Sequence, residues 1–172
     1  MSPPPNILAL DVAKTTGFCH GVAGGPIYFG SNTAAPAGAG HGEIQRKFWR
    51  WLNDLIITVN PTIIAVEDTL DPRWVSKTTN PKTFKLLIAL AESVSAIASG
   101  RGVYNVQYIE ASKIRKHFIG KNPKRDEGKR LTMRQCRLLG HNVMTDDQAD
   151  AIALHDYMTA MLRQADLLER VR

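Results

Sequence analysis

The alternation of apolar and polar positions predicts three short strands near the start of the chain. An apolar run of strand length covers residues 7–10 and ends at Asp11. A polar turn leads to a second strand near residues 18–22, and Ala23-Gly24-Gly25-Pro26 turns the chain into a third strand at residues 27–31. Because strands joined by such short turns pair antiparallel, this part of the sequence predicts a three-stranded meander.

Helical and strand patterns alternate in the middle of the chain. Apolar residues recur at three- and four-residue spacing over residues 43–59, which predicts a helix. A β-branched apolar run at residues 62–66 then ends at Glu67 and predicts a buried strand. A second, unusually apolar helix is expected over Lys82–Ser99, and a fifth strand over residues 103–109.

The order of these elements predicts the fold class. The tail from Ala111 onwards is helical in pieces, with a final helix from about Asp147 to Leu168. Strands separated by helices require parallel pairing with right-handed crossovers. We therefore expect an α/β fold with a five-stranded mixed sheet, made of a three-stranded antiparallel meander plus two parallel strands and flanked by helices. A single domain over residues 1–172 fits this length.

The composition narrows the class of partner. The chain is 44% hydrophobic and 22% charged, which is typical of a globular protein, and its net charge of +6 favours a polyanionic partner. Cys19 and Cys136 are isolated, so neither a zinc knuckle nor a disulfide framework is indicated. No secretion signal is recognisable, and the most apolar stretch, residues 86–98, is interrupted by Glu92. We expect a cytoplasmic protein with no membrane partner.

Four carboxylates lie at the ends of predicted elements in a way that indicates a metal site. Asp11 and Glu67 follow apolar strands, and Asp147 and Asp150 begin the last helix at a spacing that places both on one face. If the two strands are neighbours in the sheet, the last helix can bring its acids against theirs. Such a cluster of hard oxygen ligands suits two Mg²⁺ or Mn²⁺ ions and the hydrolysis of a phosphodiester.

Asp68 and Asp146 are neighbours of these acids with a different expected role. Strand alternation turns Asp68 to the face opposite Glu67, and Asp146 precedes the face that the helix presents. Both are expected to be solvated or to cap the helix. We favour Asp147 over Asp146 as a metal ligand, and the choice between them stays open.

At these residues the sequence resembles the RuvC-type Holliday-junction resolvases of the ribonuclease H-like superfamily. The matching segments are residues 7–11 with Thr16-Gly17 following, residues 64–67, and residues 147–153, whose D-x-x-D-A pattern is the most specific. The presence of Val12-Ala13, where bacterial members usually have Pro-Gly, resembles the more divergent viral members. The resemblance implies an Mg²⁺-dependent endonuclease that nicks four-way DNA junctions symmetrically. It also implies two ions in each active site, Mn²⁺ as a substitute, and the four carboxylates as ligands.

The resemblance also implies basic residues near the scissile phosphate. Ser112-Lys113 with Lys129 resembles that region, and Lys113 is the closer match and the candidate catalytic residue. The surrounding tract is strongly basic against only Asp126 and Glu127, which favours phosphate contact over a merely solvated helix face. The candidate DNA contacts are Lys14, Arg73, Trp74, Lys77, Lys113, Arg115, Lys116, Lys121, Lys124, Arg125, Lys129 and Arg130.

Two further features follow from the resemblance. Family members open the junction centre with an aromatic side chain, and Trp74 is placed to stack on an unpaired base, although it is equally compatible with an ordinary surface or core position. A homodimer through the Lys82–Ser99 helix is expected, so that two active sites face the two symmetric strands. Apolar residues of this helix suit that interface or burial against the sheet: Leu86, Leu87, Leu90, Val94 and Ile97.

Other functions were weighed against this interpretation. An Asp followed by a Thr-Gly turn also opens the actin-like sugar kinases, but these need a second lobe that 172 residues cannot supply. The sequence has no G-x-x-x-x-G-K-[ST] loop, and no nucleotide cofactor is expected. A ribonuclease H acting on RNA–DNA hybrids and a non-catalytic junction-binding protein remain as alternatives. A pure binder would gain nothing from acids that face phosphates.

Overall fold

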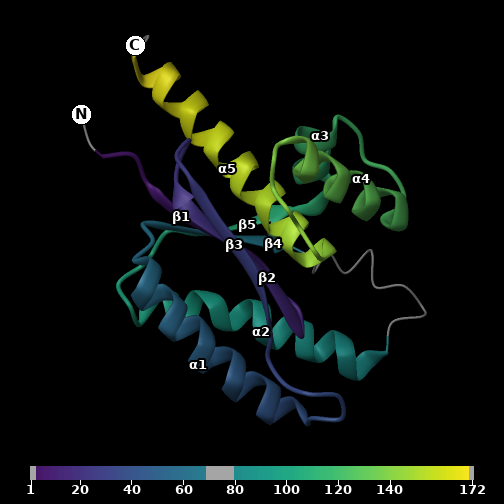
Figure 1. The fold of residues 1–172 in the computed structure, drawn as a ribbon. Coiled ribbons are helices and arrows are strands. Elements are labelled where there is room, and N and C mark those ends of the chain that lie inside the picture. The colour runs from purple at the N-terminus through teal and green to yellow at the C-terminus, as the bar shows by residue number, and fades with distance from the viewer. Residues whose placement is uncertain (1–2, 69–79, 171–172) are drawn as a thin grey trace.

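The computed structural model describes residues 3–68 and 80–170. The described residues form a mixed sheet with helices on both faces (Figure 1). The strands are β1 (Asn6–Asp11), β2 (Thr15–Val22), β3 (Ile27–Thr33), β4 (Ile63–Asp68) and β5 (Val106–Glu110). The helices are α1 (His41–Val59), α2 (Pro81–Ser99), α3 (Ala111–Ile119), α4 (Arg125–Leu138) and α5 (Asp146–Arg170).

The topology confirms the predicted fold class. In the described part of the chain the sheet has five strands in the order β3-β2-β1-β4-β5. Strands β1, β2 and β3 pair antiparallel, whereas β4 pairs parallel to both β1 and β5. Leu10 pairs with Val66, so Asp11 and Glu67 are the next residues on two neighbouring strands.

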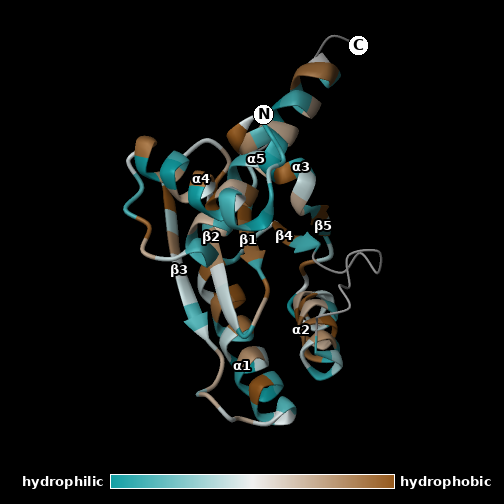
Figure 2. Cartoon of the chain, turned by 90° about the vertical axis from the view of Figure 1, so that its right-hand side faces the viewer, coloured by the Kyte–Doolittle hydropathy of each residue, from teal (hydrophilic) through white to brown (hydrophobic). Residues whose placement is uncertain are grey.

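Both faces of the sheet are buried. Leu8 and Leu10 point into a core shared with α1 and α2, and Ile7 and Ala9 point into a core shared with α3, α4 and α5. The two helical layers lie on opposite sides of the sheet in both views, and α1 and α5 alternate between hydrophobic and hydrophilic residues along their length (Figures 1 and 2). Because β1 is covered on both sides, it reads as a continuous apolar run.

Several boundaries of the predicted elements differ from the structure; β2, for example, begins at Thr15, three residues earlier than predicted. Strand β5 begins at Val106, three residues later than predicted. The apolar residue Val103 instead closes the end of α2, where its backbone N–H donates to the carbonyl of Ala98 at 2.9 Å and its side chain is buried. Between Ala111 and the last helix, where the sequence predicted helical segments without bounds, the structure has the two helices α3 and α4. None of the described helices is long and apolar enough to cross a membrane.

Helix α2 supplies more of the core than expected. Leu86, Leu90 and Val94 were candidates for a dimer interface, but all three are buried in the protein's own core between α1 and the sheet. Of the two roles expected for these residues, burial against the sheet is the one that the structure shows, because a single helix stripe that faces the sheet passes through all three. Leu87 and Ile97 are only partly buried.

Candidate active site

Two acids lie side by side at the carboxyl ends of β1 and β4. The buried residues before them fix the face: Ala9 and Ala65 point toward α5, and two residues further Asp11 and Glu67 must do the same. Glu67 is buried and Asp11 half-buried. The parallel register of β1 and β4 therefore brings these carboxylates together under the layer of α3, α4 and α5.

The start of α5 places two more carboxylates at this end of the sheet. The hydroxyl of Thr145 accepts a hydrogen bond from the backbone N–H of Gln148 at 3.3 Å, which caps the first turn of the helix. Asp147 is half-buried and Asp150 is buried, one turn apart on the same face. Helix α5 also packs closely on β1 and β2, so its first turn cannot move away from the strand ends without disturbing the core.

Burial and mutual repulsion raise the pKa values of these acids. Burial, followed by the charges of Glu67, Asp150 and Asp147, raises the pKa of Asp11 well above its usual range. Burial and then the charge of Asp150 raise the pKa of Glu67 to about 7, and burial raises the pKa of Asp150 to about 6. Asp11 is thus affected by the charges of the other three acids, and Asp150 acts on both Asp11 and Glu67, as expected for carboxylates near one another at one end of the sheet.

Asp146 and Asp147 have different surroundings. Asp146 forms an ion pair with Lys129 of α4, and this hydrogen bond lowers the pKa of Asp146. Burial raises the pKa of Asp147, and its charge acts on Asp11. Asp146 is therefore paired with a cation, although its charge also raises the pKa of Asp150, whereas the charge of Asp147 acts on both Asp11 and Asp150. The choice of Asp147 over Asp146 as a metal ligand stays a prediction.

The four carboxylates fit a divalent metal ion by their chemistry. They offer hard oxygen donors, as Mg²⁺ and Mn²⁺ require. Among residues 3–68 and 80–170 no hydrogen bond to any of the four takes up this charge, and no three His, Cys, Asp or Glu side chains are close enough together to hold an ion. The described residues thus supply donors of suitable chemistry at one end of the sheet without forming a complete ligand shell.

Cations from α3 and α4 border the acid cluster. The charge of Arg115 lowers the pKa of both Glu67 and Asp150, and Lys129 opposes the shifts of all four acids. Arg115 is half-buried and passes over Gly128, where a Cβ would lie 3.5 Å from its Nε atom. The Arg115 side chain thus lies within van der Waals reach of position 128, against the first turn of α4.

Other predicted contact residues lie further from the acids. Lys113 pairs with Glu110 at 3.1 Å on an exposed part of α3, and it is not among the main causes of the pKa shifts of the four carboxylates. Lys121 pairs with Glu127 at 2.8 Å, and the Lys14 ammonium donates to the carbonyl of Pro36 at 3.0 Å. The other exposed candidates are Lys116 on α3, Lys124 just before α4, and Arg125 and Arg130 on α4. Three candidates lie outside the described residues: Arg73, Trp74 and Lys77.

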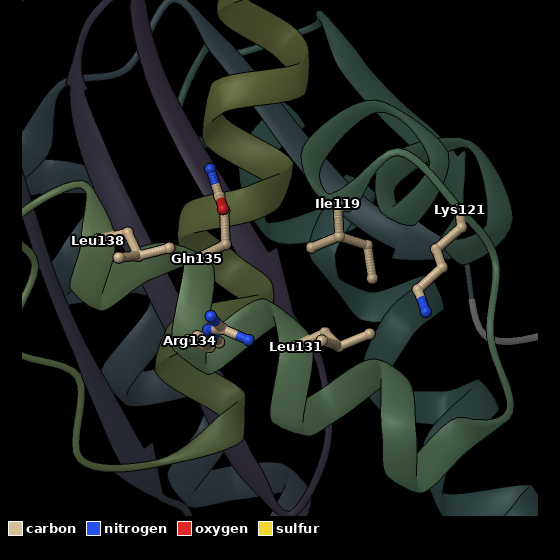
Figure 3. A pocket seen from close by; sticks show the side chains of 6 residues that line it. All are labelled: Ile119, Lys121, Leu131, Arg134, Gln135 and Leu138. Atoms are coloured by element: carbon tan, nitrogen blue, oxygen red, sulfur yellow. The ribbon is translucent and has the colours of Figure 1, made fainter.

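The basic surface also carries a small hollow between the end of α3 and α4 (Figure 3). Its volume is about 160 Å³, and its lining residues are Ile119, Lys121, Leu131, Arg134, Gln135 and Leu138. None of the four carboxylates borders it. Lys121 and Arg134 add two positive charges to the same surface, so the hollow belongs to the basic face rather than to the acid cluster.

Sequence reasoning named Arg115 as a DNA contact but not as a neighbour of the acids. A signal existed: Ile114 and Phe118 are the apolar positions of a short amphipathic helix, and Arg115 lies beside them on the helical wheel. Gly17 was noted only as part of a motif, yet the structure packs it against the first turn of α5. That contact joins residues 130 positions apart, so the local pattern of apolar and polar residues could not predict it.

Comparisons with known proteins agree with this architecture. No protein-family model matches the sequence, and no curated protein does. Among solved structures, Thermus thermophilus RuvC has a TM-score of 0.71 at 13% identity, covering 93% of this chain and 96% of that one. T. thermophilus RuvC in complex with a Holliday junction substrate has a TM-score of 0.69 at 12% identity, with 92% and 96% coverage. The yeast mitochondrial Holliday junction resolvase Ydc2 has a TM-score of 0.61 at 14% identity, with 95% and 82% coverage. The chain therefore has the ribonuclease H-like fold in the form found in RuvC-type Holliday-junction resolvases.

Proposed function

We propose that this protein is a metal-dependent endonuclease that resolves four-way DNA junctions by nicking two symmetric strands. The proposal rests chiefly on one observation: Asp11 and Glu67 end neighbouring strands, and the first turn of α5, which carries Asp147 and Asp150, packs at Gly17 beside Asp11. The basic α3–α4 face beside them suits a phosphate backbone. The fold, shared with proteins described as junction resolvases, supports DNA junctions as the substrate class.

The acids of this chain would hold two Mg²⁺ ions, with Mn²⁺ as a substitute. The ions, when bound, supply activation of water and stabilisation of the leaving oxygen in phosphodiester hydrolysis. The chain's own part is to present deprotonated carboxylates. Since the pKa of Glu67 is about 7 and that of Asp150 about 6, both acids must lose protons before they bind a cation. Loading with metal is therefore expected to weaken below neutral pH.

Arg115 and Lys129 would hold the scissile strand against the acids. Both project from the α3–α4 layer toward the carboxylates, and neither is fully exposed. Their charges favour the close approach of a phosphate that the acids alone would repel. Lys113, the residue chosen from the sequence, would contact DNA at a more peripheral position, where it now pairs with Glu110.

A homodimer through α2 would bring two active sites to one junction. With Leu86, Leu90 and Val94 in the core and Ile97 packed against it, the interface would use other, partly buried positions of the helix, such as Leu87. A two-fold axis then relates the two acid clusters in the way that a junction relates its two continuous strands. Equilibrium sedimentation, with Leu87→Lys as the disrupting variant, measures this association directly.

Cleavage of a synthetic four-way junction tests the function. In Mg²⁺ or Mn²⁺ we expect paired nicks at symmetric positions, and loss of nicking in Asp11→Asn and Asp150→Asn with junction binding retained. Asp54→Asn, a change of the same type on the outer surface of α1, serves as the matched control and should cut normally. Preferential cutting of an RNA–DNA hybrid would identify a ribonuclease H instead. Salt-dependent binding without any cutting would identify a non-catalytic binder.

A further inference from the structure

Gly17 is the point on β2 where the first turn of α5 rests. It pairs with Asp11 across the β1–β2 ladder, and residues directly opposite in an antiparallel pair project to the same face. A Cβ added at Gly17 would lie 1.9 Å from the carbonyl oxygen of Asp147 and 2.4 Å from its carbonyl carbon. Non-bonded carbon atoms keep about 3.5 to 4 Å apart. The backbone of Asp147 thus occupies the space that any side chain at position 17 would need.

The neighbouring threonine fixes the turn that delivers Gly17. Thr16 is fully buried, and its hydroxyl donates to the carbonyl of Ala13 at 2.8 Å. The backbone N–H of Ala13 approaches the same hydroxyl oxygen at 3.4 Å. This side chain bridges the tight connection between β1 and β2. The position of Gly17 opposite Asp11 is therefore held by contacts within the turn itself. Helix α5 then docks on a surface that is already defined.

We propose that Gly17 is a positioning residue, whose missing side chain sets the depth at which α5 docks and hence the separation of the Asp147 and Asp11 carboxylates. Thr16 supports it by holding the turn. This inference rests on the proposed metal-dependent function. Mg²⁺ tolerates little departure from octahedral geometry at about 2.0 to 2.1 Å, and a displacement of about 1 Å can cost a site about 100-fold in rate. A methyl group at position 17 demands a displacement of that size or more.

Gly17→Ala tests the inference, with Gly21→Ala as the matched control. Gly21 lies on the same strand and face, and a Cβ there would meet the carbonyl oxygen of Pro26 at 2.4 Å, within the β2–β3 hairpin. Each variant therefore adds a methyl group that clashes with a backbone carbonyl group, that of Asp147 or that of Pro26, and both should lower the melting temperature. Only Gly17→Ala should speed hydrogen exchange at the start of α5, by about 10-fold or more, in the metal-free protein.

Metal binding gives the second measurement. The Mn²⁺ concentration at which the melting temperature begins to rise, which tracks the dissociation constant, should increase about 10- to 100-fold in Gly17→Ala and stay near the wild-type value in Gly21→Ala. If Gly17→Ala does not fold, Thr16→Val should raise this concentration while Thr16→Ser, which keeps the hydroxyl, should not. Wild-type values in all the position 16 and 17 variants, or equal losses in Gly21→Ala, would overturn the positioning role. A wild-type protein that Mn²⁺ fails to stabilise would instead contradict the proposed function, while exchange at α5 would still report on the docking.

Discussion

Replacing Glu67 by glutamine should stabilise the metal-free protein at the same time as it removes cleavage. In the folded chain Glu67 is buried next to Asp150, and these surroundings raise its pKa from 4.5 to about 7. Between pH 4.5 and 7 the folded protein therefore binds more protons at this site than the unfolded chain does. Stability falls as the pH rises through this window, and above it the folded protein must hold a buried, repelled carboxylate.

The magnitude follows from the size of the shift. A rise from 4.5 to about 7 corresponds to a destabilisation of about 3 kcal/mol at pH 8, at about 1.4 kcal/mol for each pKa unit. Glutamine has nearly the same shape and no charge, but its amide also needs hydrogen-bond partners, so this value is an upper bound. A net gain of about 1 to 3 kcal/mol raises the melting temperature of a chain this long by about 3 to 10 °C.

Thermal unfolding at pH 5 and pH 8, with and without Mn²⁺, measures the effect. The stabilisation by Glu67→Gln should appear at pH 8 and largely vanish at pH 5, where the wild-type side chain is itself protonated. Mn²⁺ should raise the melting temperature of the wild-type protein and not that of the variant. Glu43→Gln on α1 is the control, because Glu43 is exposed, pairs with Lys47 and has a lowered pKa. A variant that is less stable than the wild-type protein at pH 8, or a gain that does not change with pH, would refute this reasoning.

Three further predictions concern single residues. Asp147→Asn should reduce the single-turnover cleavage rate by about 100-fold or more, whereas Asp146→Asn, which removes only the partner of a cation, should reduce it by less than about 10-fold. Arg115→Ala should slow cleavage by about 100-fold and Lys113→Ala by less than about 10-fold. The reverse order would favour the choice of Lys113 made from the sequence. His155 is buried on α5 and its burial lowers its pKa below 6.5, so the unfolded chain binds more protons near pH 6. Stability should fall as the pH drops below 6.5, and urea titrations of His155→Gln should show a weaker fall.

Most of the acid cluster could be anticipated because its members mark the ends of regular elements. Asp11 and Glu67 follow apolar runs whose period of two also gives the face on which they lie, and Asp147 and Asp150 are one helical turn apart. The cations next to these acids were harder to choose. Arg115 and Lys113 are two positions apart on one helix, and only the packing of α3 against α4 shows which of them turns inward.

The sequence by itself determined the number and order of the strands, their mixed pairing and the positions of four acids at the ends of β1 and β4 and the start of α5. These properties depend on periodicity, turn chemistry and residue type, all of which are encoded over a few neighbouring positions. Only the tertiary structure decided that Asp146 pairs with Lys129, that Leu90 belongs to the core, and that Gly17 packs against the backbone of Asp147. Those outcomes depend on the distance between elements far apart in the chain. Side-chain packing between the helices and the sheet fixes that distance, and it cannot be predicted from the pattern of a few neighbouring residues.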